Sequence, residues 1–160
     1  MALVTGSGRG LGRMIAETLL NGGAAIALHD INEEAPAAFG ESASLTALAE
    51  ELSRRGGAKV VSVTGDISQE SDVAALVKKV EAALGPISIL VNCAGGDIAA
   101  KGGKPNPNDA LNISLEDTQA VMNRNFIGTM LMCRAVVVGP GLTALTRTPW
   151  GRISSARQRV

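Results

Sequence analysis

The sequence predicts an α/β fold of the doubly wound, Rossmann-like type, with a parallel sheet between two helix layers. Two observations predict it. Short apolar runs of strand length alternate with segments whose apolar residues recur at helical spacing. The first apolar run passes directly into a glycine-rich turn, "TGSGRGLG" (residues 5–12), that precedes a helix. Because crossovers between parallel strands are right-handed, four such strands favour the order 3-2-1-4.

The first half of the chain supplies two strands and two helices. The run "MALVT" is apolar and breaks into glycines, which indicates a buried strand. The triplet "NGG" ends the first helix, with Gly22 or Gly23 in the left-handed conformation that terminates helices. The polar stretch "INEEAPAAFGESAS" indicates a loop. The predicted elements are a strand at 1–5, a helix at 11–20, a strand at 24–28 and a helix at 45–55.

The second half repeats the pattern. Ser68 is expected to cap a helix whose apolar residues recur every three or four positions, and Gly85-Pro86 ends it. Ser114 and Asp117 predict a capping box at the start of a long helix that reaches about residue 138. The other elements are strands at 59–63 and 87–92 and a long loop at 95–112 that is rich in Gly, Pro and Asn.

Composition favours one globular domain of 160 residues, with 46% hydrophobic and 19% charged residues. Cys93 and Cys133 lie in apolar surroundings, so we expect two buried, reduced thiols rather than a disulfide. The chain opens with no charged and apolar leader pattern, and no apolar run reaches the roughly 18 residues of a membrane span. We therefore expect a cytoplasmic protein without a membrane partner.

The charge is balanced in number but uneven in position. The net charge is zero, and no acidic residue follows Asp117. The arginines after that point are Arg124, Arg134, Arg147, Arg152, Arg157 and Arg159. A basic segment of this kind can meet phosphate or nucleic acid. Because no aromatic residues interleave the arginines for base stacking, we favour a helix followed by a frayed tail and expect no nucleic-acid partner.

The glycine turn is the strongest chemical signal. Leu11 and Gly12 stand where a phosphate-loop motif requires Gly-Lys, and a strict G-x-G-x-x-G starting at Gly8 would end on Arg13. The spacing that matches is G-x-x-x-G-x-G, through Gly6, Gly10 and Gly12. Such glycines let the backbone approach a diphosphate, whose charge faces the free N–H groups of the following helix. A tight turn without a ligand is the alternative.

Asp30 strengthens the ligand interpretation. It follows the second strand, 18 positions after Gly12, where an acid can bind a 2′-hydroxyl of an adenosine ribose. Asp30 would repel a 2′-phosphate and favours NAD, whereas Arg9 could attract that phosphate and favour NADP. We prefer NAD, because the carboxylate acts at shorter range than a flexible arginine.

Four motifs in order resemble those of the classical short-chain dehydrogenase/reductase family. They are "TGSGRGLG", "GDIS", "VNCAGG" and "NRNFIGT", and the match covers about residues 1–138. The resemblance implies a dinucleotide site, with Asp66 and Ile67 at the adenine ring and Asn125 in the catalytic proton relay. Asn92 is implied either at the cofactor or as a brace of the central strand. His29 is expected to be only a strand-end residue, and no cluster of residues at metal-ligand spacing is present, so we expect no metal.

Together, the loop and the resemblance imply a specific set of residues. The predicted cofactor-binding residues are Gly6, Ser7, Arg9, Gly10, Leu11, Gly12, Asp30, Ile31, Asp66, Ile67, Asn92, Ala94 and Gly95. Near the end of the chain, "GRISSA" resembles the family's fifth-strand segment, so Ser155, or less strongly Ser154, would be the substrate-binding serine.

The family transfers hydride between a nicotinamide and a carbonyl or alcohol, with a tyrosine as proton donor and a lysine that lowers its pKa. This sequence has no tyrosine. We therefore expect an incomplete dinucleotide-binding domain over 1–160, interrupted near its fifth strand, with a divergent tail at 139–160. An exposed sheet edge predicts marginal stability or self-association. Two functions stay open: an oxidoreductase of small alcohols or ketones that is inactive alone, and a non-catalytic dinucleotide-binding or interaction module.

Overall fold

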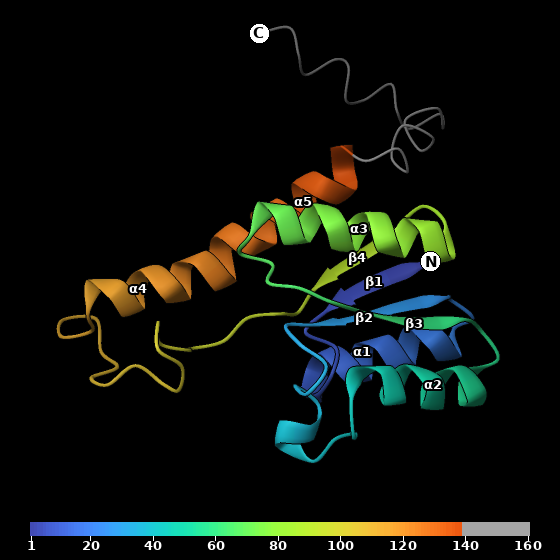
Figure 1. Cartoon of the computed structure of the whole chain (residues 1–160), viewed down its shortest axis with the longest axis horizontal. Helices are drawn as coiled ribbons and strands as arrows, with labels where there is room; N and C mark the ends of the chain where they lie inside the picture. Colours follow the sequence, from blue (N-terminus) through green and yellow to red (C-terminus); the bar gives the residue numbers. More distant parts are fainter. Residues whose placement is uncertain (139–160) are drawn as a thin grey trace, which may run out of the picture.

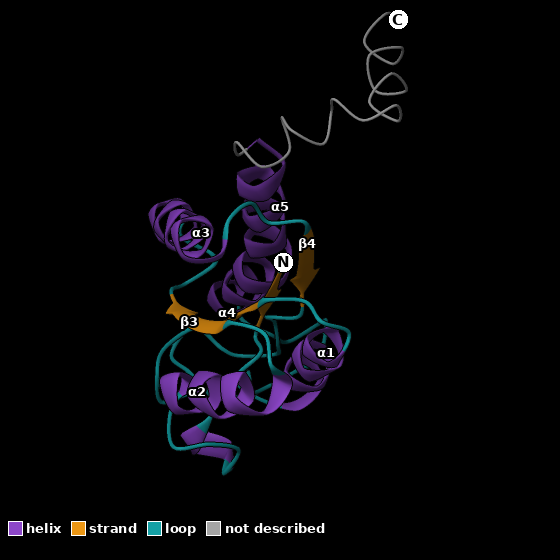
Figure 2. Ribbon diagram, turned by 90° about the vertical axis from the view of Figure 1, so that its right-hand side faces the viewer, coloured by secondary structure: helices purple, strands orange, loops and turns teal. Residues whose placement is uncertain are grey.

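The computed structural model describes residues 1–138 and shows a three-layer α/β/α arrangement (Figures 1 and 2). Four parallel strands lie in the order β3-β2-β1-β4, which confirms the predicted fold class and strand order. Helices α1 and α2 cover one face of the sheet, and α3 with α5 covers the other (Figure 2). In order, the elements are β1 (Ala2–Thr5), α1 (Gly10–Asn21), β2 (Ile26–Asp30), the short 3₁₀ helix η1 (Ala37–Phe39), α2 (Leu45–Gly56), β3 (Val60–Thr64), α3 (Glu70–Leu84), β4 (Ile89–Asn92), α4 (Leu115–Met122), the π-helix η2 (Asn123–Ile127) and α5 (Gly128–Val138).

The two cores follow from the alternation of side chains along the strands. Val4 and Leu28 face α1 and α2, whereas Leu3 and Ala27 face α3 and α5. Strand β1 is buried along its whole length because it pairs with β2 on one side and β4 on the other. Its carboxyl end is therefore a rigid support for the loop that follows.

Helix ends largely confirm the glycine and serine signals. Gly23, at φ +89°, follows α1, and Gly57, at φ +67°, ends α2, as glycines in the left-handed region do. The predicted cap at Ser68 is wrong. Gln69 precedes α3 instead, and the Ser68 hydroxyl donates to Asp66 Oδ1 at 2.8 Å because the chain is still turning there.

The long C-terminal helix differs from its prediction in two respects. Ser114 Oγ accepts the Asp117 N–H at 3.0 Å as expected, but the Asp117 carboxylate accepts from the Ala100 N–H, so the box is only half formed. The helix also widens into a π-helix at Asn123–Ile127, which its apolar pattern did not indicate.

The prediction of two buried cysteines is wrong. Both are free, but Cys93 is only half-buried and Cys133 is exposed. Both lie beside β4, which pairs with β1 alone among the described residues and whose Ile89 is 41% exposed. Side chains around an edge strand are covered from fewer directions than those at the sheet centre.

Ser154, Ser155 and the arginines from Arg147 onward lie outside the described residues. Within residues 1–138, no helix combines the length and the apolar character that a membrane crossing requires.

Candidate functional site

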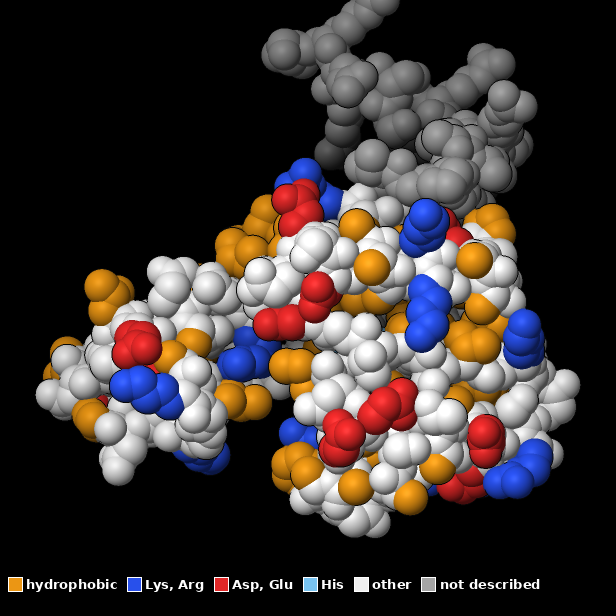
Figure 3. Space-filling model, viewed as in Figure 1, with side chains coloured by type: hydrophobic (Ala, Val, Ile, Leu, Met, Phe, Trp, Pro, Cys, Tyr) orange, Lys and Arg blue, Asp and Glu red, His pale blue; other side chains and the backbone are white. Residues whose placement is uncertain are grey.

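A cavity of about 550 Å³ lies at the carboxyl ends of the strands, beside the glycine loop. This volume is typical of small-molecule sites. In the space-filling view, the surface is hollowed between the lobe that carries α4 and the part that carries η1 and α1 (Figure 3). Eleven of the predicted cofactor residues line the cavity, and they are Gly6, Arg9, Gly10, Leu11, Gly12, Asp30, Ile31, Asp66, Ile67, Ala94 and Gly95.

The glycine loop is so closely packed that two of its glycines, Gly6 and Gly12, have no room for a side chain. A Cβ on Gly12 would lie 2.2 Å from the Gly6 carbonyl oxygen. A Cβ on Gly6 would lie 2.7 Å from Ala94 Cα, and Gly6 has a φ of +64°. The contact with Ala94 joins the loop after β1 to the segment after β4. Close packing therefore holds the loop in place, with its backbone exposed to the cavity.

Two backbone donors at the start of α1 are free. Within residues 1–138, the N–H groups of Leu11 and Gly12 make no hydrogen bond, and both residues line the cavity. The first N–H groups of any helix have no partner inside the helix, and together with the helix dipole they attract anions. The arrangement can therefore hold a phosphate or diphosphate group without any cationic side chain.

The Asp30 carboxylate lines the same cavity and has a fixed orientation. Its Oδ2 accepts the Gly8 N–H at 3.1 Å, and its Oδ1 accepts the Ile31 N–H at 2.9 Å. A Cβ on Gly8 would lie 2.7 Å from Oδ2, so a larger residue there would displace the Asp30 carboxylate. Each carboxylate oxygen can accept a second hydrogen bond, which leaves Asp30 able to bind hydroxyl groups.

Ser7 and Asn92 do not line the cavity. Ser7 is fully buried. Its hydroxyl donates to the Val4 carbonyl at 2.8 Å and accepts the His29 N–H at 2.9 Å, and its own N–H donates to the His29 carbonyl. The Asn92 amide donates to Cys133 Sγ at 3.4 Å, between β4 and α5. In this structure both side chains brace the sheet.

Thr5 is a structural residue that the sequence did not single out. Its Oγ1 accepts the N–H groups of both Cys93 and Ala94 at 3.1 Å and lies 3.4 Å from the Val91 carbonyl oxygen. One buried hydroxyl therefore ties the end of β1 to the turn after β4. Its position as the last strand residue before the glycines was the available signal, but its partners lie 86 to 89 residues away.

His29 lies in the wall of the cavity and is 2% exposed. Its Nε2 is 3.0 Å from the Gly65 carbonyl oxygen, which requires a proton on Nε2, and its buried Nδ1 has no partner among the described residues. Burial lowers the pKa of His29, although the Gly65 contact and the charges of Asp30 and Asp66 act to raise it. The imidazole is therefore neutral at pH 7.

Asn125 lies in the π-helix and does not reach the cavity wall. Its Oδ1 accepts the Gly96 N–H at 2.9 Å, and its Nδ2 donates to the carbonyls of Gly96 at 2.9 Å and Val121 at 2.8 Å. A Cβ on Gly95 would lie 2.6 Å from Oδ1, so a larger residue there would displace the Asn125 amide. The side chain positions the Gly95-Gly96 backbone, and its two amide N–H groups are committed to the carbonyls of Gly96 and Val121.

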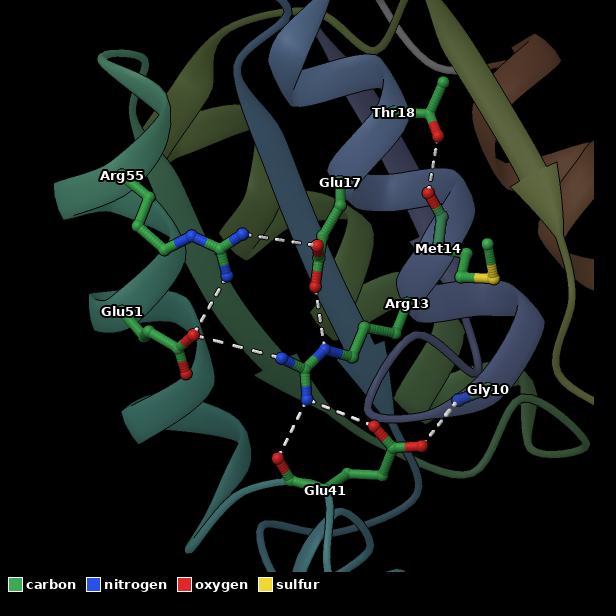
Figure 4. Close-up of polar contacts among 8 residues, drawn as sticks. All are labelled: Gly10, Arg13, Met14, Glu17, Thr18, Glu41, Glu51 and Arg55. Atoms are coloured by element: carbon green, nitrogen blue, oxygen red, sulfur yellow. Dashed lines mark hydrogen bonds and ion pairs between the residues drawn. The ribbon is translucent and has the colours of Figure 1, made fainter.

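Arg13 of α1 organises a network of ion pairs on the outer side of the glycine loop (Figure 4). It contacts Glu17 at 2.8 Å, Glu41 at 3.1 Å and Glu51 at 3.9 Å. The hydrogen bond with Glu17, with the charges of all three carboxylates, raises the pKa of Arg13. Glu41 Oε1 also accepts the Gly10 N–H at 3.4 Å, so the loop before α2 is tied to the glycine loop.

Comparison with known proteins agrees with this geometry. The sequence profile of the short chain dehydrogenase family matches residues 1–153. The chain belongs to this family. It is 37% identical over 134 residues to the 3-hydroxyacyl-CoA dehydrogenase type-2 of Drosophila melanogaster, an alignment that covers 84% of this chain and 47% of that protein.

Solved structures show the same half of the family fold. A 3-oxoacyl-[acyl-carrier protein] reductase from Brucella melitensis in complex with NAD is 31% identical with a TM-score of 0.72, over 92% of this chain and 51% of that one. An L-sorbose reductase from Gluconobacter frateurii, complexed with NADPH and L-sorbose, is 27% identical with a TM-score of 0.72, over 89% and 47%. This chain spans about half the length of the relatives it matches.

Proposed function

We propose that this chain binds NAD(H) in the cavity beside the glycine loop, as the cofactor-binding part of a short-chain dehydrogenase. The observation that carries the proposal is the pair of free N–H groups at Leu11 and Gly12, with the Asp30 carboxylate in the same cavity. A bound nicotinamide cofactor supplies hydride chemistry between an alcohol and a carbonyl. The substrate class that we propose is a small alcohol or ketone.

Each part of the cavity has a proposed partner on the cofactor. The Leu11 and Gly12 amides would hold the diphosphate, and Asp30 would accept hydrogen bonds from the adenosine ribose. Asp66 and Ile67 would border the adenine. The Asp66 carboxylate is held by the N–H and hydroxyl of Ser68, at 2.9 and 2.8 Å, so its orientation is fixed before a ligand binds.

For catalysis, we propose that these 160 residues bind cofactor without turnover. The sequence has no tyrosine, the family's proton donor, and general acid–base catalysis is worth about 10²- to 10⁴-fold in rate. Asn125 would contribute by positioning the Gly95-Gly96 backbone at the cavity. We also propose Ser155 as the substrate-binding serine, although it lies outside the described residues. This proposal favours the binding-module alternative for the chain alone.

Calorimetric titration of NAD⁺ and NADH tests the proposal. We expect saturable binding, and we expect Asp30→Ala to weaken it by about ten- to a hundredfold, because a hydrogen bond to a charged group is worth about 1.5–3 kcal/mol. Glu50→Ala is the matched control, because Glu50 is an exposed acid on α2 outside the cavity. A folded sample that gives no heat with millimolar coenzyme would contradict binding. Robust ketone reduction by the purified chain would contradict the absence of turnover.

A further inference from the structure

Arg9 and Phe39 form a stacked pair, and both residues line the cavity. The Arg9 Cζ lies 3.5 Å from the centroid of the Phe39 ring, at the contact distance of a cation–π pair. Arg9 comes from the glycine loop and Phe39 from η1, 30 positions later. Phe39 is 60% exposed, so its ring is not there to complete the core.

The stacked guanidinium keeps its hydrogen-bonding edge free. Among residues 1–138, the Arg9 side chain makes no hydrogen bond and no ion pair, although Asp30 and Glu34 line the same cavity. An arginine presents its N–H donors in the plane of the guanidinium, and stacking covers only the face. The pair is therefore a cationic donor held in place and available to a ligand.

The segment that carries Phe39 is held in place on both sides of η1. Gly40, at φ +69°, ends η1, and the next residue, Glu41, bonds to the Arg13 guanidinium and to the Gly10 N–H. Before η1, Glu33 accepts hydrogen bonds from the N–H and hydroxyl of Thr46 at 2.9 and 3.0 Å. The segment that carries Phe39 is thus tied at both ends, to α1 and to α2.

The charge of Asp30 opposes a phosphate at this place, but it is partly compensated. Both of its oxygens already accept backbone N–H groups, from Gly8 and Ile31. Bound donors reduce the negative potential that a carboxylate presents to its surroundings. The cavity therefore contains an acid, Asp30, whose charge is partly compensated, and a base, Arg9, that has no ion-pair partner among the described residues.

We infer that Phe39 is a specificity-determining positioning residue: it holds Arg9 where the guanidinium edge binds the 2′-phosphate of NADP(H), so that the cavity accepts both dinucleotides. This inference rests on the proposed function, because it requires a dinucleotide in the cavity. Phe39 does not touch the phosphate and acts only through Arg9.

Calorimetry with NAD⁺, NADP⁺ and 2′,5′-ADP on the whole chain tests the inference. We expect Phe39→Leu to raise the Kd of NADP⁺ and 2′,5′-ADP about two- to fivefold, which corresponds to the energy of an exposed cation–π pair, and to leave the Kd of NAD⁺ unchanged. Phe39→Tyr keeps an aromatic face and should restore the wild-type ratio. The reference ligand is 5′-AMP, which lacks the 2′-phosphate. We expect the wild-type chain to bind 2′,5′-ADP more tightly than 5′-AMP, and we expect Arg9→Leu to abolish this difference in Kd.

The outcomes separate the inference from the proposed function. If the wild-type chain binds NAD⁺ but not NADP⁺, or if Phe39→Leu weakens both coenzymes equally, the specificity role is wrong and the proposed function stands. If a folded wild-type sample binds neither coenzyme, the proposed function fails and this inference fails with it.

Discussion

The two flanks of the sheet are built differently. The β1–α1–β2 flank is closely packed, with the whole of β1 buried and glycines in contact with backbone atoms. The β4–α4 flank is open among the described residues, with Ile89 41% and Leu115 82% exposed, and single side chains such as Thr5 and Asn125 hold it in place. The glycine loop is thus preorganised by packing, whereas the opposite wall of the cavity depends on a few hydrogen bonds.

The largest effect is expected inside the packed flank. Gly12→Ala places a methyl group 2.2 Å from the Gly6 carbonyl oxygen, and neither backbone can move without disturbing the other. We expect a loss of about 3 kcal/mol in the free energy of unfolding, measured by urea denaturation. Gly10→Ala is the matched control: no atom lies within 4 Å of its Cβ, and its φ of +54° costs about 1 kcal/mol. Equal losses for the two variants would show that the loop is not closely packed.

The next effect concerns the hydroxyl that joins the two flanks. Thr5→Val keeps the shape of the side chain but leaves the N–H groups of Cys93 and Ala94 without their acceptor, so we expect a loss of about 2 kcal/mol. Amide hydrogen exchange should accelerate at Cys93 and Ala94 before it does in β1. Thr5→Ser retains the acceptor and should lose only about 1 kcal/mol through its missing methyl group. Unchanged exchange at both amides in Thr5→Val would mean that β4 does not depend on this contact.

A pH-dependent effect is expected at His29, in the wall shared by the two flanks. Burial lowers its pKa in the folded state below the ordinary 6.5, so the unfolded chain binds more protons in the interval between the two values. The stability contributed by neutral His29 is complete above about pH 6.5 and falls as the pH decreases, by at most about 1.4 kcal/mol per pH unit. Urea unfolding between pH 5 and 8 should show this slope in the wild type.

The matched variant for that measurement is His29→Gln, which cannot take up a proton in this range. Its unfolding free energy should be lower at pH 8, because the Gly65 contact is disturbed, but flatter between pH 5 and 6.5. Parallel wild-type and variant curves would assign the acid sensitivity to other groups.

The smallest effect is expected at Glu41, which links the loop before α2 to the glycine loop. Glu41→Gln removes a charge from an exposed ion pair with Arg13 and should cost about 0.5 kcal/mol of stability. The same change weakens a carboxylate that competes for the Gly10 N–H, so dinucleotide affinity should rise about twofold, a shift of about 0.4 kcal/mol. Glu51→Gln, which contacts Arg13 at 3.9 Å but not Gly10, should lower stability without tightening binding. A tighter complex in both variants would point to net charge rather than to competition at Gly10.

Local patterns carried most of the fold and part of the site. Strand and helix periodicity, right-handed connection and the glycine turn were enough for the sheet order. Asp30 was found because it stands at the end of the second strand, where the structure makes it the last residue of β2, and 18 positions after Gly12. The same reasoning treated neighbouring loop residues as equivalent. It grouped Ser7 with the glycines, although the Ser7 hydroxyl turns into the sheet and bonds to Val4 and His29.

The amino-acid sequence alone determined the alternation of elements, the loop that suits an anion and the absence of tyrosine, because these depend on spacing and residue type along the chain. Only the tertiary structure decided that Thr5 holds the turn after β4, that Asn125 spends its amide on Gly96 and that Phe39 supports Arg9. Each of those contacts joins residues 29 or more positions apart, and such pairs meet only when the sheet and its crossovers bring their elements together.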